Sequence, residues 1–224
     1  MGGSQMSSRA GREQAVVDLV GALCYALLHT FEAAARGATA APSIELAEEQ
    51  QAFAADESDR FKVLRARLAA LTDAPEEAMA TFRSPLDSFY SEARPEGWLE
   101  TQVFHFVGDT ITTDFAELVA ARLDPETADA VRHALTGRTE HQAFALQQIG
   151  EAVEREGSAA QDRIAQYAGT IVGKGLNTLR GALLENDALE VVLDGEAGVK
   201  EMVLELLGRH RERLERLGLD RLDD

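Results

Sequence analysis

Cysteine is nearly absent from this chain, since Cys24 is the only one among 224 residues. One thiol excludes a disulfide framework and a metal site built from cysteine pairs, and in its apolar run Cys24 is typical of a small core residue. We therefore expect a reducing, cytoplasmic location. The sequence also contains no HExxH zinc motif and no nucleophile elbow, so the usual signatures of zinc proteases and serine hydrolases are missing.

Basic residues are few relative to acidic ones. The chain has 22 lysines and arginines against 39 aspartates and glutamates, which gives a formal net charge of -17. A molecule with this negative net charge repels phosphate backbones at long range, so we do not expect nucleic acid as a partner.

A long uninterrupted hydrophobic run is missing as well. The run from Leu19 to Leu28 is shorter than the roughly 20 apolar residues that cross a bilayer. Ionisable residues flank the run on both sides, namely Glu13 and Asp18 before it and His29 and Glu32 after it. This pattern does not match a signal peptide. We interpret the run as a buried helix and expect no membrane partner.

Helical periodicity runs through most of the sequence, and strand-like alternation does not occur. We predict a disordered tail over residues 1–10 and a single helical domain over residues 11–219. Caps and breakers predict long helices at about 12–36, 43–71, 98–123, 125–157, 158–186 and 198–217, with short pieces at 76–82 and 85–93. The predicted fold class is all-α, a four-helix bundle with two additional C-terminal helices and a short helical connector.

Glu57 lies where the periodicity requires a hydrophobic residue. Its stripe advances by threes and fours along one helix face and consists of Phe53, Glu57, Arg60, Phe61, Leu64, Leu68 and Leu71. A lone buried carboxylate is costly, so it shifts its pKa, pairs with a cation or binds a metal.

Two other predicted helices carry the same anomaly. Asp114 interrupts the apolar stripe of the third long helix, and Arg138 and His141, three residues apart, interrupt that of the fourth. We therefore predict one buried polar centre made of Glu57, Arg60, Asp114, Arg138 and His141. The i, i+3 spacing is that of the Glu-x-x-His pairs of di-iron helical bundles, with one member of each pair changed to arginine.

At these residues the chain resembles the ferritin-like family related to the tRNA hydroxylases that act on methylthio-isopentenyl-adenosine. The matching segments are LVGALCYALLHTFEAAA, ADESDRFKVLRARLAAL, VGDTITTDFAELVA and TGRTEHQAFAL for the bundle helices, with SPLDSFY and GWLE in the connector. The resemblance covers about residues 19–219. It implies a ferritin-like four-helix bundle, a homodimer and, where the metal site is intact, iron-dependent oxygen chemistry.

When the metal ligands of that family are transferred to this sequence position by position, the resemblance implies a degenerate di-iron site. Ligand positions fall on Leu27, Arg60 and Arg138, none of which binds iron. The residues that keep ligand chemistry are Glu57, Asp114 and His141, with Asp109 as a possible outer acid.

The charges suggest what replaces the metals. Two ferrous ions balance four carboxylates in an intact centre, and here Arg60 and Arg138 would balance two acids. We hypothesise a buried Arg/carboxylate network in a non-catalytic binding or structural protein without a cofactor, in which Arg60→Leu would cost about 3 to 5 kcal/mol. The alternative is an oxidoreductase, a hydroxylase, that uses iron or manganese bound by Glu57, Asp114 and His141.

Overall fold

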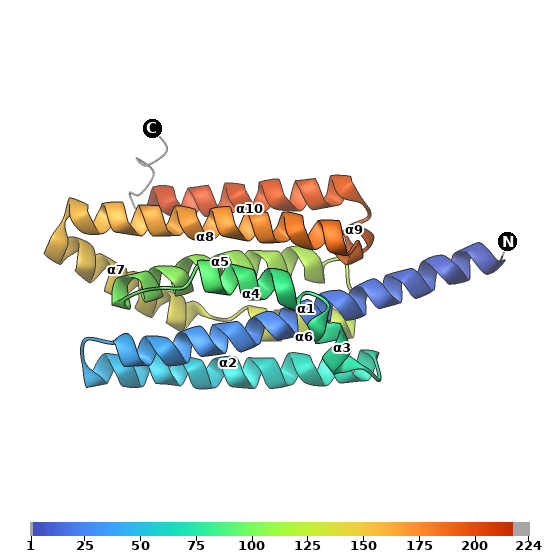
Figure 1. Cartoon of the computed structure of the whole chain (residues 1–224), viewed down its shortest axis with the longest axis horizontal. Helices are drawn as coiled ribbons and strands as arrows, with labels where there is room; N and C mark the ends of the chain where they lie inside the picture. Colours follow the sequence, from blue (N-terminus) through green and yellow to red (C-terminus); the bar gives the residue numbers. More distant parts are fainter. Residues whose placement is uncertain (1, 217–224) are drawn as a thin grey trace.

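A computed structural model describes the backbone of residues 2–216 and the side chains of residues 10–215 (Figure 1). The helices are α1 (Gly2–Ala40), α2 (Ile44–Leu71), α3 (Pro75–Ala80), α4 (Arg83–Glu92), α5 (Trp98–Ala120), α6 (Pro125–Leu135), α7 (Thr139–Glu156), α8 (Ser158–Glu185), α9 (Ala188–Val192) and α10 (Glu196–Arg216). No strand occurs within residues 2–216. The prediction of an all-α fold is therefore confirmed.

The bundle consists of α1, α2, α5 and the α6–α7 segment. The hairpin of α1 and α2 lies along the lower edge of Figure 1, and α5 packs against α6, α7 and α8. The short helices α3 and α4 form the connector, and α10 packs on α5 and α9. The observed architecture is the predicted four-helix bundle with additional C-terminal helices.

Two hydrophobic clusters hold the helices together. The larger joins α1, α2, α5, α6 and α9 through residues that include Val20, Leu27, Leu64, Val119 and Val131, and the smaller joins α5, α7 and α8 through residues that include Val103, Ile149, Ile164 and Ile171. Burying each such side chain contributes about 1.5 to 3 kcal/mol. Because α5 contributes to both clusters, it is the central helix of the molecule.

Helix α1 differs from its predicted bounds at both ends. Its backbone is helical from Gly2, within the predicted tail 1–10, and it continues past Gly37 to Ala40. Gly37 is a packing residue and not the predicted helix stop, because a Cβ there would lie 2.7 Å from Cγ2 of Thr101. The helix ends where Pro42 prevents its continuation.

The apolar run of α1 lies in the core. By length and composition alone, residues Ala10–Ala40 could cross a membrane, and 44% of their apolar window is buried against the rest of the protein. Cys24 is buried there, and burial raises the pKa of its thiol to about 12. A thiol with this pKa is inert near neutral pH.

Candidate functional site

Arg138 lies at a break between α6 and α7. The sequence predicts one continuous helix over residues 125–157. Gly137 has a φ of 72°, which ends α6 at Leu135 and allows α7 to begin at Thr139. This left-handed backbone is strained for residues other than glycine. The side chain of Arg138 enters the bundle from the break, and the residue is only 3% exposed.

The guanidinium of Arg138 binds Glu57 with two parallel hydrogen bonds. Its Nε donates to Oε1 of Glu57 over 2.8 Å, and its Nη2 donates to Oε2 over 2.9 Å. Nη1 donates to the carbonyl of Leu135, and Nε also lies 3.5 Å from Oδ1 of Asp109. The hydroxyl of Thr30 lies 2.8 Å from Oε2 of Glu57. Two carboxylates therefore share one buried cation.

Asp109 and two histidines complete the buried centre. Nδ1 of His141 lies 3.0 Å from Oδ2 of Asp109, an ion contact that is not aligned as a hydrogen bond. Burial alone would raise the pKa of Asp109, but His141 and Arg138 outweigh it and hold that pKa below its usual value. Burial, helped by His141 and Arg138, lowers the pKa of His105 to about 3, so this imidazole is neutral near pH 7.

Two buried glutamines fix the orientation of His105. Nε2 of Gln102 donates to Oε1 of Gln50, and Nε2 of Gln50 donates in turn to Nε2 of His105, both over 3.1 Å. Because Nε2 of His105 accepts this hydrogen bond, its proton is on Nδ1. The ring of Phe53 stacks on His141 with 4.2 Å between the ring centroids.

Arg60 lies at the rim of the centre and not within it. Its Nε is 3.7 Å from Oε1 of Glu57, while Nη1 and Nη2 donate to the carbonyls of Thr136 and Gly137. These bonds satisfy carbonyls at the C-terminal end of α6. Burial, followed by the charge of Arg138, lowers the pKa of Arg60. Both predicted arginines therefore contact Glu57, but only Arg138 binds both of its oxygens from within the bundle.

The structure does not bring Asp114 to this centre. Its carboxylate accepts hydrogen bonds from Arg209, over 3.1 Å, and from Arg213, both on α10. Asp114 follows Asp109 by five residues, which rotates its side chain by about 140° around α5. The alternative metal set of Glu57, Asp114 and His141 is therefore not a cluster in this structure. Asp109, which was expected only outside the ligand set, lies in the buried centre beside Arg138 and His141.

Sequence reasoning also missed His105 and its two glutamines. Within the described residues, His105, Asp109 and His141 are the group whose ligand atoms approach as a metal site requires, within 4.8 Å of one another. A usable signal was present, because Gln102, His105 and Asp109 follow one another by three and four residues on one face of α5.

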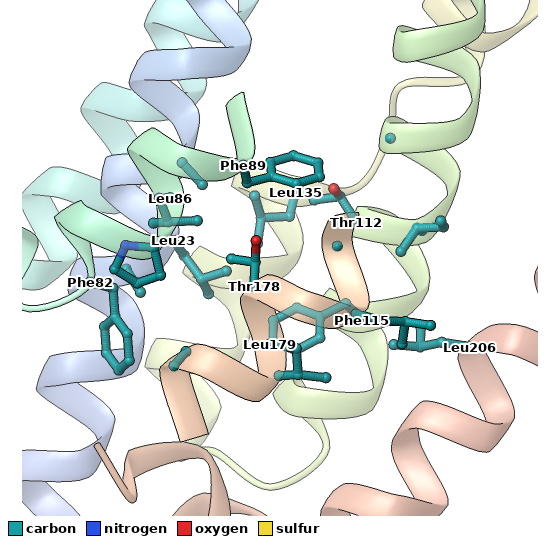
Figure 2. A pocket seen from close by; sticks show the side chains of 18 of the residues that line it. Leu23, Phe82, Leu86, Phe89, Thr112, Phe115, Leu135, Thr178, Leu179 and Leu206 are labelled. Atoms are coloured by element: carbon teal, nitrogen blue, oxygen red, sulfur yellow. The ribbon is translucent and has the colours of Figure 1, made fainter. Parts of the chain in front are cut away.

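An apolar cavity of about 350 Å³ reaches this centre. Its lining side chains come from α1, α4, α5, α6, α8, α9 and α10, and Figure 2 shows among them Leu23 of α1, Phe89 of α4, Phe115 of α5, Leu179 of α8 and Leu206 of α10. Along α1 the lining runs from Leu19 to Thr30, a span of about 16 Å of helix. The cavity is therefore elongated.

The polar end of the cavity coincides with the buried centre. Its polar lining includes Thr30, Tyr90, His105, Asp109 and Arg138. Thr30 contacts Glu57, which is paired with Arg138, so these groups gather at the Thr30 end of the α1 wall. This arrangement can hold an apolar molecule in contact with a few directed polar groups.

A two-iron centre does not fit these residues. Arg138 occupies both oxygens of Glu57, and its positive charge lies between Glu57 and Asp109, where it would repel added cations. Leu27, which the resemblance places at a helix-one ligand position, is buried and apolar. One cation can still be considered, because Oδ2 of Asp109 and Nε2 of His141 are buried without a hydrogen-bond partner.

Comparison with known proteins agrees with the fold. The family model described as a ferritin-like domain of actinomycetes matches residues 10–196 of this chain. No curated protein matches it. Helix α10, which supplies one wall of the cavity and both arginines on Asp114, lies almost entirely beyond the matched residues.

Proposed function

Because the chain belongs to the ferritin-like domain family of actinomycetes, we propose that it retains the helical bundle of that family as a binding protein for an apolar small molecule. In this proposal the protein is not catalytic. The ion pair of Arg138 with Glu57 stands in place of metal ions, and the neighbouring cavity holds the ligand.

The observation that carries the proposal is the position of Arg138. Its guanidinium pairs with Glu57, and Arg138 also lines the polar end of the apolar cavity. A cavity of about 350 Å³ lies within the size range of small-molecule sites. An empty apolar space of this size would also lower stability, because its lining side chains lose packing contacts. A bound apolar molecule would restore those contacts.

Filling the cavity should weaken binding. Gly108 lines the cavity, and a Cβ added there would meet no atom within 4 Å. We expect Gly108→Leu to weaken binding of the neutral fluorescent probe N-phenyl-1-naphthylamine at least about tenfold, the effect of about 1.4 kcal/mol. Fluorescence titration measures the dissociation constant, and mass spectrometry of an organic extract identifies any ligand purified with the protein.

The matched control is Gly150→Leu. Gly150 lies in α7, is exposed, and also has no atom within 4 Å of an added Cβ. Both variants replace a helical glycine, so both gain similar helix propensity. Equal probe affinity in the two variants, or no binding by the unmodified protein, would contradict the proposed function.

A second candidate function keeps a metal. His105, Asp109 and His141 offer two imidazoles and one carboxylate, a donor set that suits a single ferrous or manganese ion. An ion bound there would supply oxidoreductase chemistry of the kind that the finer resemblance to tRNA hydroxylases implies. The adjacent Arg138 opposes a dication, and for this reason the binding function is preferred.

The remaining expectations about assembly and location become part of this proposal. We propose a cytoplasmic homodimer that does not bind nucleic acid. Light scattering coupled to size-exclusion chromatography measures the mass in solution, and a mass equal to one chain would contradict the dimer.

A further inference from the structure

We propose that the cavity ligand is a neutral alcohol, with an elongated apolar tail and one hydroxyl group that binds between Tyr90 and Asp109. This inference rests on the proposed binding function and specifies the chemistry of its ligand. It follows from the hydrogen-bonding groups that the polar end of the cavity leaves unused and from the charges that surround them.

Tyr90 presents an unused hydroxyl at the polar end. Its ring is held by stacking on His29, with centroids 4.3 Å apart and planes 7° apart, and by an edge contact with Phe89. Tyr90 lines the cavity, and no residue that the structure describes hydrogen bonds its hydroxyl. Burial raises the pKa of this phenol, and the charge of Glu57 raises it further. The hydroxyl therefore remains protonated and can both donate and accept.

Asp109 supplies the complementary acceptor. Its Oδ2 is buried in a residue that lines the cavity, and its one close polar neighbour, Nδ1 of His141 at 3.0 Å, is not aligned as a hydrogen bond. Tyr90 stacks on His29, the neighbour in sequence of Thr30, whose hydroxyl contacts Glu57, so Tyr90 lies at the same end of the cavity as Asp109. An alcohol can donate to Oδ2 of Asp109 and accept from Tyr90 with the same oxygen.

The surrounding charges disfavour an acidic or a basic head group. Arg138 already pairs with Glu57 and lies 3.5 Å from Asp109, so a further carboxylate would be repelled by two acids that share this one cation. An ammonium group would lie beside the cation of Arg138, which also lines the cavity, and would be repelled by it. Glu57, Asp109, Arg138 and Arg60 sum to zero formal charge, and a neutral head group leaves that balance intact.

The apolar part of the cavity determines which ligand tail fits. Apart from its polar end, the lining is dominated by leucine, isoleucine, valine, alanine and phenylalanine side chains from α1, α4, α5, α8 and α10. The α1 wall is about 16 Å long, which favours an extended chain over a compact ring system. The inferred ligand class is therefore a long-chain alcohol, aliphatic or isoprenoid.

The test is competition of matched chains against N-phenyl-1-naphthylamine, a neutral probe without a hydroxyl. We expect dodecan-1-ol to bind at least about tenfold more tightly than dodecanoate or dodecylamine. Tyr90→Phe should weaken dodecan-1-ol binding by about three- to tenfold, the loss of one neutral hydrogen bond, and should leave probe affinity unchanged. Phenylalanine keeps the stacking ring, so the fold is preserved.

Tyr25→Phe is the matched control, because the Tyr25 hydroxyl donates to Asp87 and does not line the cavity. Equal or tighter binding of the acid or the amine would overturn the inference. A Tyr90→Phe variant that binds dodecan-1-ol as the unmodified protein does would also overturn it. Failure of the probe itself to bind would contradict both the proposed function and the inference. The two results above would overturn the inference alone, so the failures are distinguishable.

Discussion

Replacing Arg138 with methionine is expected to lower the free energy of unfolding by about 3 to 5 kcal/mol. The variant leaves Glu57 with Thr30 and the distant rim contact of Arg60, and it leaves Asp109 without its cation. Two carboxylates that have lost their shared guanidinium would then lie in a core in which both residues are no more than 5% exposed. Urea denaturation followed by circular dichroism measures the loss.

Two further variants separate the ionic pair from simple packing loss. Glu57→Leu combined with Arg138→Met removes both charges and should recover much of the stability lost in the single variant, because a buried pair replaced by apolar groups is often close to neutral. Arg60→Met should cost about 1 kcal/mol, the value of a partly exposed pair and cap. The idea fails if Arg138→Met unfolds at the same urea concentration as the unmodified protein.

Acid should destabilise the protein through His105. The folded state holds this imidazole neutral because its pKa is lowered to about 3, whereas the unfolded chain binds a proton near the ordinary pKa of about 6.5. The unfolded state therefore binds more protons below pH 6.5, and stability falls as the pH decreases toward 3. The contribution amounts to about 1.4 kcal/mol per pH unit, or about 2 kcal/mol by pH 5.

His105→Gln should remove most of this slope, because the glutamine does not titrate and can still hydrogen bond with Gln50. His133→Gln is the control, since His133 is exposed on α6. A smaller slope should remain from His210, whose pKa is also lowered by burial. Denaturation at about pH 7 and about pH 5 measures the difference. Identical slopes in His105→Gln and the unmodified protein would show that His105 does not carry the effect.

The fold could be predicted because long helical periodicity and capping residues are local signals. Ser43 caps α2 and Asp124 with Pro125 opens α6, as the sequence predicts. The break at Gly137 was missed, since one glycine within a helical pattern does not reveal its backbone angles. The role of Gly37 was also missed, because its close approach to Thr101 depends on how α1 packs against α5.

The sequence predicted only part of the candidate site, because the two helices that carry its acids are buried to different extents. On α2 one face is buried and the other exposed, so the stripe through Glu57 identified a buried carboxylate. Helix α5 is central and buried around much of its circumference, so apolar spacing does not select the face that meets Arg138. Asp114 was therefore placed at the centre in the sequence analysis, and Asp109 with His105 occupies it in the structure.

We propose that the ion pair of Arg138 with Glu57 takes the place of metal ions in this ferritin-like bundle. The direct measurement is the iron content of purified protein, loaded anaerobically with ferrous ion, separated from excess metal, and analysed by inductively coupled plasma mass spectrometry. The account predicts well below one iron per chain, because a guanidinium already neutralises the buried carboxylates. One iron per chain that is lost in His105→Ala would favour the mononuclear metal site instead. Two irons per chain would contradict the account outright.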